Sequence, residues 1–139
     1  MLWLQMFLMA AALGAAEQQV LEEVNAHRRA QGLAALAWHE PAAAEARKHC
    51  SRLLAGKTGG PHDGFSERAA RLRRATGARR AGENVFLQDR GQFHPAAALS
   101  AWLASDGHRS TLEGPFELSG VGVVERGGRV CATEIFLGR

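Results

Sequence analysis

The chain has 139 residues, of which 46% are hydrophobic and 22% are charged, as is typical of a soluble globular protein. No linker, repeat or low-complexity tail divides it, which excludes a multidomain organisation and leaves one domain with a substantial core. The formal net charge of +3 at pH 7 comes mostly from arginine, because Lys48 and Lys57 are the only lysines.

The first sixteen residues predict a secretory signal peptide. They carry no charged side chain, and an apolar run at Leu2–Met9 is followed by small residues that end at Ala16. The segment is too short to span a bilayer, which needs about 20 apolar residues. We expect cleavage after Ala16, a single domain over residues 17–139, and a secreted or periplasmic location. An uncleaved apolar anchor is the alternative.

Four helices are predicted in the remaining chain from apolar side chains at helical spacing. Gly32 suits the end of the first helix, and Pro41 suits the first turn of the second. We expect Gly107 to end the last helix in a left-handed conformation, which places His108 on a turn. The predicted helices cover residues 17–31, 41–55, 66–75 and 95–105.

Strands are predicted in the second half of the chain, at residues 84–87, 119–125 and 129–137. Gly127 and Gly128 separate the last two, which is a typical signal of a β-hairpin. Helices and strands are therefore mixed, and the pattern predicts an α+β domain.

Cys50 and Cys131 are the only cysteines. Cys50 lies on an apolar helical stripe with Ala46 and Leu53, and Cys131 lies on an apolar strand face with Ile135. Two inward cysteines in an exported protein predict a disulfide. Two buried thiols that never meet are the alternative.

Six arginines crowd residues 68–80. A solvated helix accounts for them, and a patch for anionic lipid, cell-wall polymer or nucleic acid is the alternative. No aromatic residue lies between them to stack on bases, which argues against nucleic acid and leaves weak attraction to anionic surfaces. These residues are Arg68, Arg71, Arg73, Arg74, Arg79 and Arg80.

Six short motifs, in this order and spacing, resemble the CAP superfamily of cysteine-rich secretory, antigen 5 and pathogenesis-related proteins, and in particular its short bacterial branch, the SCP domain. The resemblance covers residues 20–138 and implies a three-layer α-β-α sandwich with a central antiparallel sheet. The motifs are Asn25–Arg28, Gly32–Trp38, Ala46–His49, Gly82–Val85, Trp102–Leu112, and Phe116–Val123 followed by Val130–Phe136.

The resemblance also implies a cleft lined by His62, Glu83 and His108. Animal and plant members of the family have a second cleft glutamate three residues after the helix tryptophan, and this chain has Ser105 there. Two further departures are Thr111 in place of the usual Asn, and Glu134 in place of the usual Gln. The family's four cleft residues, two histidines and two glutamates, are therefore reduced in this chain to three: His62, Glu83 and His108.

Two imidazoles and a carboxylate in one cleft suit three roles. They can bind a divalent metal such as zinc, act as a general acid and base, or form a hydrogen-bonded brace without any ligand. We interpret Asn84 as a residue that fixes a loop through backbone hydrogen bonds, and His49 as a core histidine.

The leading functional hypothesis is a secreted, non-enzymatic and monomeric CAP module that binds a lipid-like, cell-wall or protein ligand. The alternative is a metal-dependent, peptidase-like hydrolase that uses His62, His108 and Glu83. No Gly-x-Ser-x-Gly motif supplies a nucleophile for acyl transfer.

Overall fold

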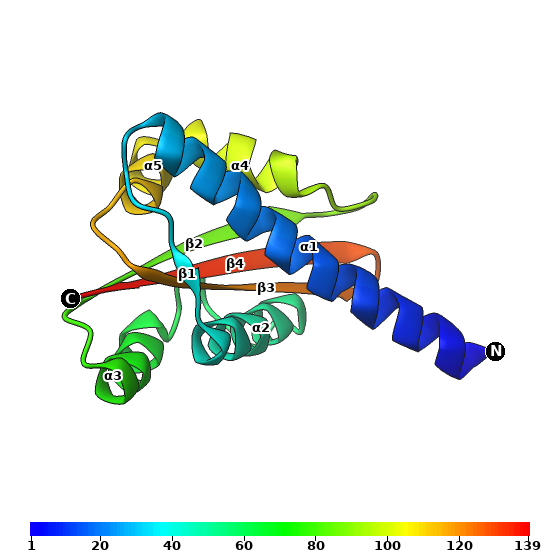
Figure 1. The fold of residues 1–139 in the computed structure, drawn as a ribbon. Coiled ribbons are helices and arrows are strands. Elements are labelled where there is room, and N and C mark those ends of the chain that lie inside the picture. The colour runs from blue at the N-terminus through cyan, green and yellow to red at the C-terminus, as the bar shows by residue number, and fades with distance from the viewer.

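The computed structural model describes residues 1–139 apart from the side chain of Ala10. Five helices surround one sheet of four strands (Figure 1). In chain order the elements are α1 (Leu2–Ala30), β1 (Ala37–Trp38), α2 (Glu40–Leu54), α3 (Phe65–Thr76), β2 (Arg80–Gln88), α4 (Pro95–Leu103), α5 (Asp106–Leu112), β3 (Leu118–Arg126) and β4 (Arg129–Gly138).

The sheet has the strand order β1-β3-β4-β2, which puts β2 at one edge. β4 pairs antiparallel with both β2 and β3, whereas the short β1 pairs parallel with β3. β3 and β4 form the predicted hairpin, and both turn residues, Gly127 and Gly128, have a positive φ, of 59° and 78°. This conformation is costly for residues that carry a Cβ, so glycine suits both positions.

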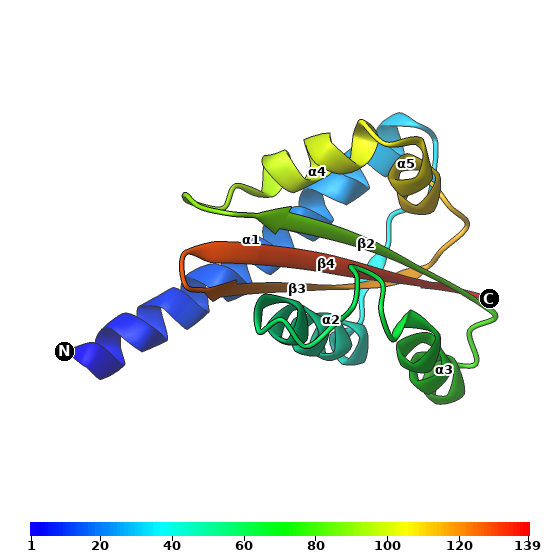
Figure 2. The same cartoon turned by 180° about the vertical axis from the view of Figure 1, so that it is seen from behind.

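Two layers of helices cover the sheet, which confirms the predicted three-layer sandwich. Figures 1 and 2 show α1, α4 and α5 over one face and α2 and α3 over the other. The first face buries a large apolar cluster that includes Val24, Trp102 and Phe136. The second buries a smaller cluster that includes Leu72 and Ile135.

Helix α2 packs unusually close to β3. A Cβ added at Gly120 or Gly122 would collide with the backbone of α2, so only glycine permits this approach. The predicted disulfide is confirmed: Cys50 of α2 is bonded to Cys131 of β4, with their Cα atoms 5.5 Å apart. α2 is thus held against the sheet by both packing and a covalent link.

Helix α1 begins well before the predicted residue 17 and continues through the expected cleavage site. Its first residues, Leu2–Met9, are exposed, whereas Val20 and Val24 further along belong to the core. No helix in the described part of the chain is long and apolar enough to cross a membrane. Cleavage after Ala16 stays a prediction.

The stretch after α4 differs from the sequence-based expectation. Gly107 does not have a left-handed conformation, since it lies inside α5 together with His108. The break between the two helices falls earlier, at Ser105, whose φ of −114° and ψ of 124° are extended. The predicted interruption after α4 is therefore present, but a new helix begins at Asp106, because an acidic residue is favourable at a helix N-terminus.

Candidate functional site

The candidate site is built on the edge strand β2, whose neighbouring residues face opposite layers. Glu83 is paired in register with Ile135, which faces α2 and α3. Asn84 is paired with Glu134 on the other face of the sheet. Because successive side chains of a strand point to opposite faces, the carboxylate of Glu83 faces α2 and α3, and the amide of Asn84 faces the other helical layer.

Glu83 is the centre of a buried polar cluster. Its side chain is 1% exposed, and its Oε1 lies 3.1 Å from Nδ1 of His62. Arg68 donates from Nε to Oε2 and from Nη2 to Oε1, both at 2.9 Å. This bidentate geometry is the strongest form of an arginine–carboxylate pair, so the carboxylate of Glu83 is held in one orientation.

Arg68 corrects the prediction of a uniformly solvated arginine helix. It is only 6% exposed, and its Nη1 also donates to the backbone oxygen of Asp63 at 2.7 Å. Its place on α3 explains the burial, because it shares a helical face with Leu72, four residues later. That spacing is the signal in the sequence that could have identified it.

The remaining arginines of the stretch lie at the surface. Arg71 forms a double hydrogen bond with Glu45 of α2, at 2.9 Å for each contact. The other four are exposed, as predicted for a solvated segment: Arg73, Arg74, Arg79 and Arg80.

His49 is a buried core histidine, as predicted, but it also belongs to the polar cluster. It is 1% exposed, and its Nε2 is hydrogen-bonded to the backbone oxygen of Pro61. The same nitrogen lies 3.9 Å from Oε1 of Glu83. Burial lowers the pKa of His49, which favours the neutral imidazole.

His108 approaches the cluster from the opposite helical layer. Its ring centroid is 6.4 Å from that of His62, and the backbone oxygen of His108 accepts a hydrogen bond of 3.0 Å from Nδ2 of Asn84. This bond agrees with the backbone-fixing role predicted for Asn84. Burial and, to a smaller extent, the neighbouring His62 lower the pKa of His108.

The three predicted residues do not form a three-ligand metal site as they stand. No group of three or more His, Cys, Asp or Glu side chains in the described part of the chain could hold a metal ion. Both oxygens of Glu83 already accept N–H groups of Arg68, and the guanidinium places a positive charge where a cation would bind. Glu83 is therefore unsuited as a ligand.

Two hollows flank the cluster. One, of about 500 Å³, is shallow and is lined by residues Gly60–Glu67, in the loop before α3 and its first turn, which include His62 but neither Glu83 nor His108. The other, of about 460 Å³, lies between α2 and α3, and both His49 and Arg68 line it. The Arg68–Glu83 pair thus borders a groove that the sequence did not reveal.

Comparison with known proteins agrees with the fold. The model of the family described as "CAP: Cysteine-rich secretory protein family" matches residues 21–136. No curated protein sequence matches the chain.

Several solved structures are similar. An extracellular protein containing an SCP domain from Bacillus anthracis has a TM-score of 0.72 and 28% identity, over 91% of this chain and 41% of the other. A cysteine-rich secretory protein from Staphylococcus aureus has a TM-score of 0.71 and 20% identity, over 91% and 39%. An outer surface protein from Borrelia burgdorferi has a TM-score of 0.75 and 14% identity, over 90% and 93%. The chain therefore spans less than half the length of the first two proteins.

Proposed function

Because this chain belongs to the CAP family of cysteine-rich secretory proteins, we propose that it is an extracellular binding module whose ligand contacts His62 and His108. The observation that carries the proposal is the double hydrogen bond from Arg68 to Glu83. This pairing occupies the carboxylate of Glu83, so the imidazoles of His62 and His108 are the groups of the cluster that we expect to contact a ligand. Lipid-like molecules, cell-wall fragments and proteins are the ligand classes that we consider.

The same contact argues for binding over catalysis. A general base must have a free lone pair directed at the substrate, whereas both oxygens of Glu83 accept hydrogen bonds from Arg68 and its side chain is 1% exposed. Neither cysteine supplies a nucleophile, because Cys50 and Cys131 are joined in a disulfide.

Two observations support an extracellular location. The disulfide between Cys50 and Cys131 belongs to the class of bond that persists in oxidising compartments. Two of the similar structures are described as an extracellular protein and an outer surface protein. Cleavage of a signal peptide after Ala16 is the export route that we propose.

The test is to identify what leaves with the purified protein. Exported wild type, the double variant His62→Ala/His108→Ala and the control His94→Ala would be isolated under native conditions and denatured. Mass spectrometry would then identify the small molecules released. We expect a molecule that accompanies wild type and the control but is lost from the double variant, since His94 is exposed and outside the cluster.

Equal retention by all three proteins would contradict a ligand at the histidine pair. The absence of any co-purifying molecule from wild type would contradict a lipid-like or cell-wall ligand.

Zinc binding stays a prediction, now restricted to His62 and His108, and the alternative of a metal-dependent hydrolase depends on it. Calorimetric titration with zinc at neutral pH and near pH 5 tests it, because protons compete with the metal for imidazole nitrogens. We expect binding at neutral pH that acid or either histidine substitution removes. Binding that survives both substitutions would place the metal elsewhere.

A further inference from the structure

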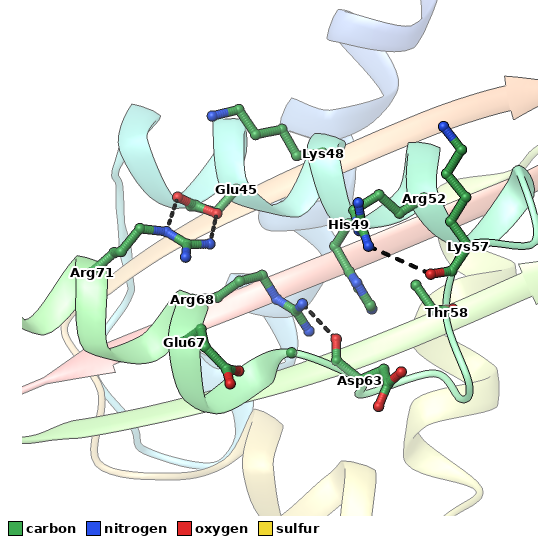
Figure 3. Close-up of a pocket in the computed structure, with 11 residues that line it drawn as sticks. Glu45, Lys48, His49, Arg52, Lys57, Thr58, Asp63, Glu67, Arg68 and Arg71 are labelled. Atoms are coloured by element: carbon green, nitrogen blue, oxygen red, sulfur yellow. Dashed lines mark hydrogen bonds and ion pairs between the residues drawn. The ribbon is translucent and has the colours of Figure 1, made fainter.

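The groove between α2 and α3 has one cationic rim and one acidic rim. Figure 3 shows Lys48, Arg52 and Lys57 along the α2 side and Asp63 and Glu67 on the opposite side. The groove has a volume of about 460 Å³, enough for a small ligand or a lipid headgroup.

Most of the other charges that line the groove are already neutralised. Arg71 is paired with Glu45, and Arg68 is paired with Glu83 behind the groove wall. On the far rim, Asp63 has no ion-pair partner among the described residues, but its carboxylate is held in place by a hydrogen bond of 2.7 Å from the backbone N–H of Gly59.

The three cations of the α2 rim are different. Within the part of the chain that the structure describes, Lys48, Arg52 and Lys57 have no ion-pair partner. Lys48 and Arg52 are four residues apart on α2 and therefore lie on the same helical face, where like charges destabilise a helix. Only two lysines occur in the chain, and both line this groove.

The backbone fixes Lys57 beside the end of α2. Gly56 has a φ of 70°, which lets the chain turn back after the helix. The N–H of Lys57 then donates to the backbone oxygen of Arg52 at 2.9 Å. In return, Nη2 of Arg52 lies 3.5 Å from the backbone oxygen of Lys57. The cationic rim is thus partly organised before any ligand arrives.

We propose that this rim binds a phosphate group through Lys48, Arg52 and Lys57. Arginine offers a planar set of donors that matches phosphate oxygens, and lysine offers a compact point charge. An anion on the α2 rim would relieve the repulsion among the three cations, whereas the acids of the far rim orient it toward α2. The phosphate can belong to a soluble molecule or to a lipid headgroup. This site is separate from the ligand contact proposed at His62 and His108.

The test compares two variants that each remove two positive charges. Lys48→Gln/Lys57→Gln alters the rim, and Arg73→Gln/Arg74→Gln alters exposed residues of α3 outside the groove. Each protein would be titrated with inorganic phosphate and with pyrophosphate by calorimetry at neutral pH and low salt. Loss of charge-assisted hydrogen bonds at the rim should weaken binding by about tenfold or more. The control should stay within about twofold of wild type, because net charge alone is screened.

A second arm distinguishes the two sources of phosphate. The same proteins would be sedimented with vesicles of phosphatidylcholine, with and without phosphatidylglycerol. Binding of phosphate but not of vesicles supports a soluble ligand, and rim-dependent binding of the phosphatidylglycerol vesicles supports a lipid headgroup. Equal weakening by both variants, or no binding of either probe by wild type, would overturn the proposal.

Discussion

Two glutamates are buried on opposite faces of the sheet, and their carboxylates have different hydrogen-bond partners. Glu83 accepts two N–H groups of Arg68. Glu134 accepts a hydrogen bond of 2.7 Å from the hydroxyl of Ser119, while its Oε2 has no partner among the described residues. Burial raises the pKa of Glu134 to about 8, and the bond from Ser119 and the charge of Arg28 only partly oppose it.

The difference lies in what each arginine binds. Arg28 is as buried as Arg68, but its N–H groups are directed to backbone oxygens of Ala34, Leu112 and Gly114, at 2.8 to 3.0 Å. It fastens α1 to the loops around α5 and gives no direct hydrogen bond to Glu134. Two equally buried arginines therefore play different parts: Arg68 forms a direct ion pair with Glu83, whereas Arg28 is bound to backbone oxygens and acts on Glu134 only through its charge.

The largest effect should follow from breaking the pair around Glu83. Arg68→Ala leaves that carboxylate buried without its countercharge, which typically costs about 3–5 kcal/mol of unfolding free energy. Urea denaturation measures this loss, and Arg73→Ala is the control, because Arg73 is exposed. Adding Glu83→Gln to Arg68→Ala should recover part of the stability. A loss of less than 1 kcal/mol in the single variant would show that the pair is not needed for folding.

Glu134→Gln should change how stability depends on pH. The pKa of Glu134 is about 8 in the folded protein, against 4.5 for an ordinary glutamate. Between pH 4.5 and pH 8, the carboxyl of Glu134 is therefore protonated in the folded state and ionised in the unfolded state. Glu134 therefore contributes stability that is present below pH 4.5 and is lost as the pH rises toward 8. An amide does not titrate, so the variant should be more stable than wild type by a few kcal/mol at pH 8, with the gap closing toward pH 4.5.

Thermal or urea denaturation of both proteins across this pH range gives the measurement. The lowered pKa values of His49 and His108 act in the opposite sense, since they reduce stability as the pH falls below 6.5. They are common to both proteins and cancel in the difference. A gap that does not vary with pH would show that Glu134 is charged in the folded protein.

Ser119→Ala should have the smallest effect of the three. It removes the single hydrogen bond to Glu134, which contributes about 1 kcal/mol in typical cases. That bond holds the pKa of Glu134 down, so its loss should raise the pKa further and make the destabilisation grow with pH. Ser100→Ala, on the exposed side of α4, provides the control in the same denaturation series. Equal stability of the two variants at pH 8 would contradict the role of Ser119.

Much of the fold could be predicted because its signals are local. The Gly127-Gly128 hairpin, the apolar face of α2 and the inward cysteines at 50 and 131 were each evident from spacing alone. The layer arrangement came from the resemblance to the CAP family. The start of α5 was missed, because Asp106 and Gly107 can equally end a helix or begin one.

The candidate site was only half predictable. His62, Glu83 and His108 came from family motifs, and the structure brings His62 to Glu83 and His108 near His62. Arg68 was missed because charge suggested a surface residue, although its spacing from Leu72 indicated the buried face of α3. Composition cannot show which member of an arginine-rich segment turns inward, since that depends on a carboxylate supplied by another element.

The contacts of Glu17 bear on how the protein can be processed. Its carboxylate accepts two N–H groups of Arg47, at 2.7 and 2.8 Å, and the backbone N–H of Val123 at 2.9 Å. Glu17 follows the predicted cleavage point and lies in the middle of α1, and its contacts tie this helix to α2 and β3. A peptidase that trimmed a single further residue would leave the guanidinium of Arg47 with only its exposed contact to Glu40. If the chain is cleaved after Ala16, as we propose, cleavage one residue later would therefore lower the stability of the shortened protein.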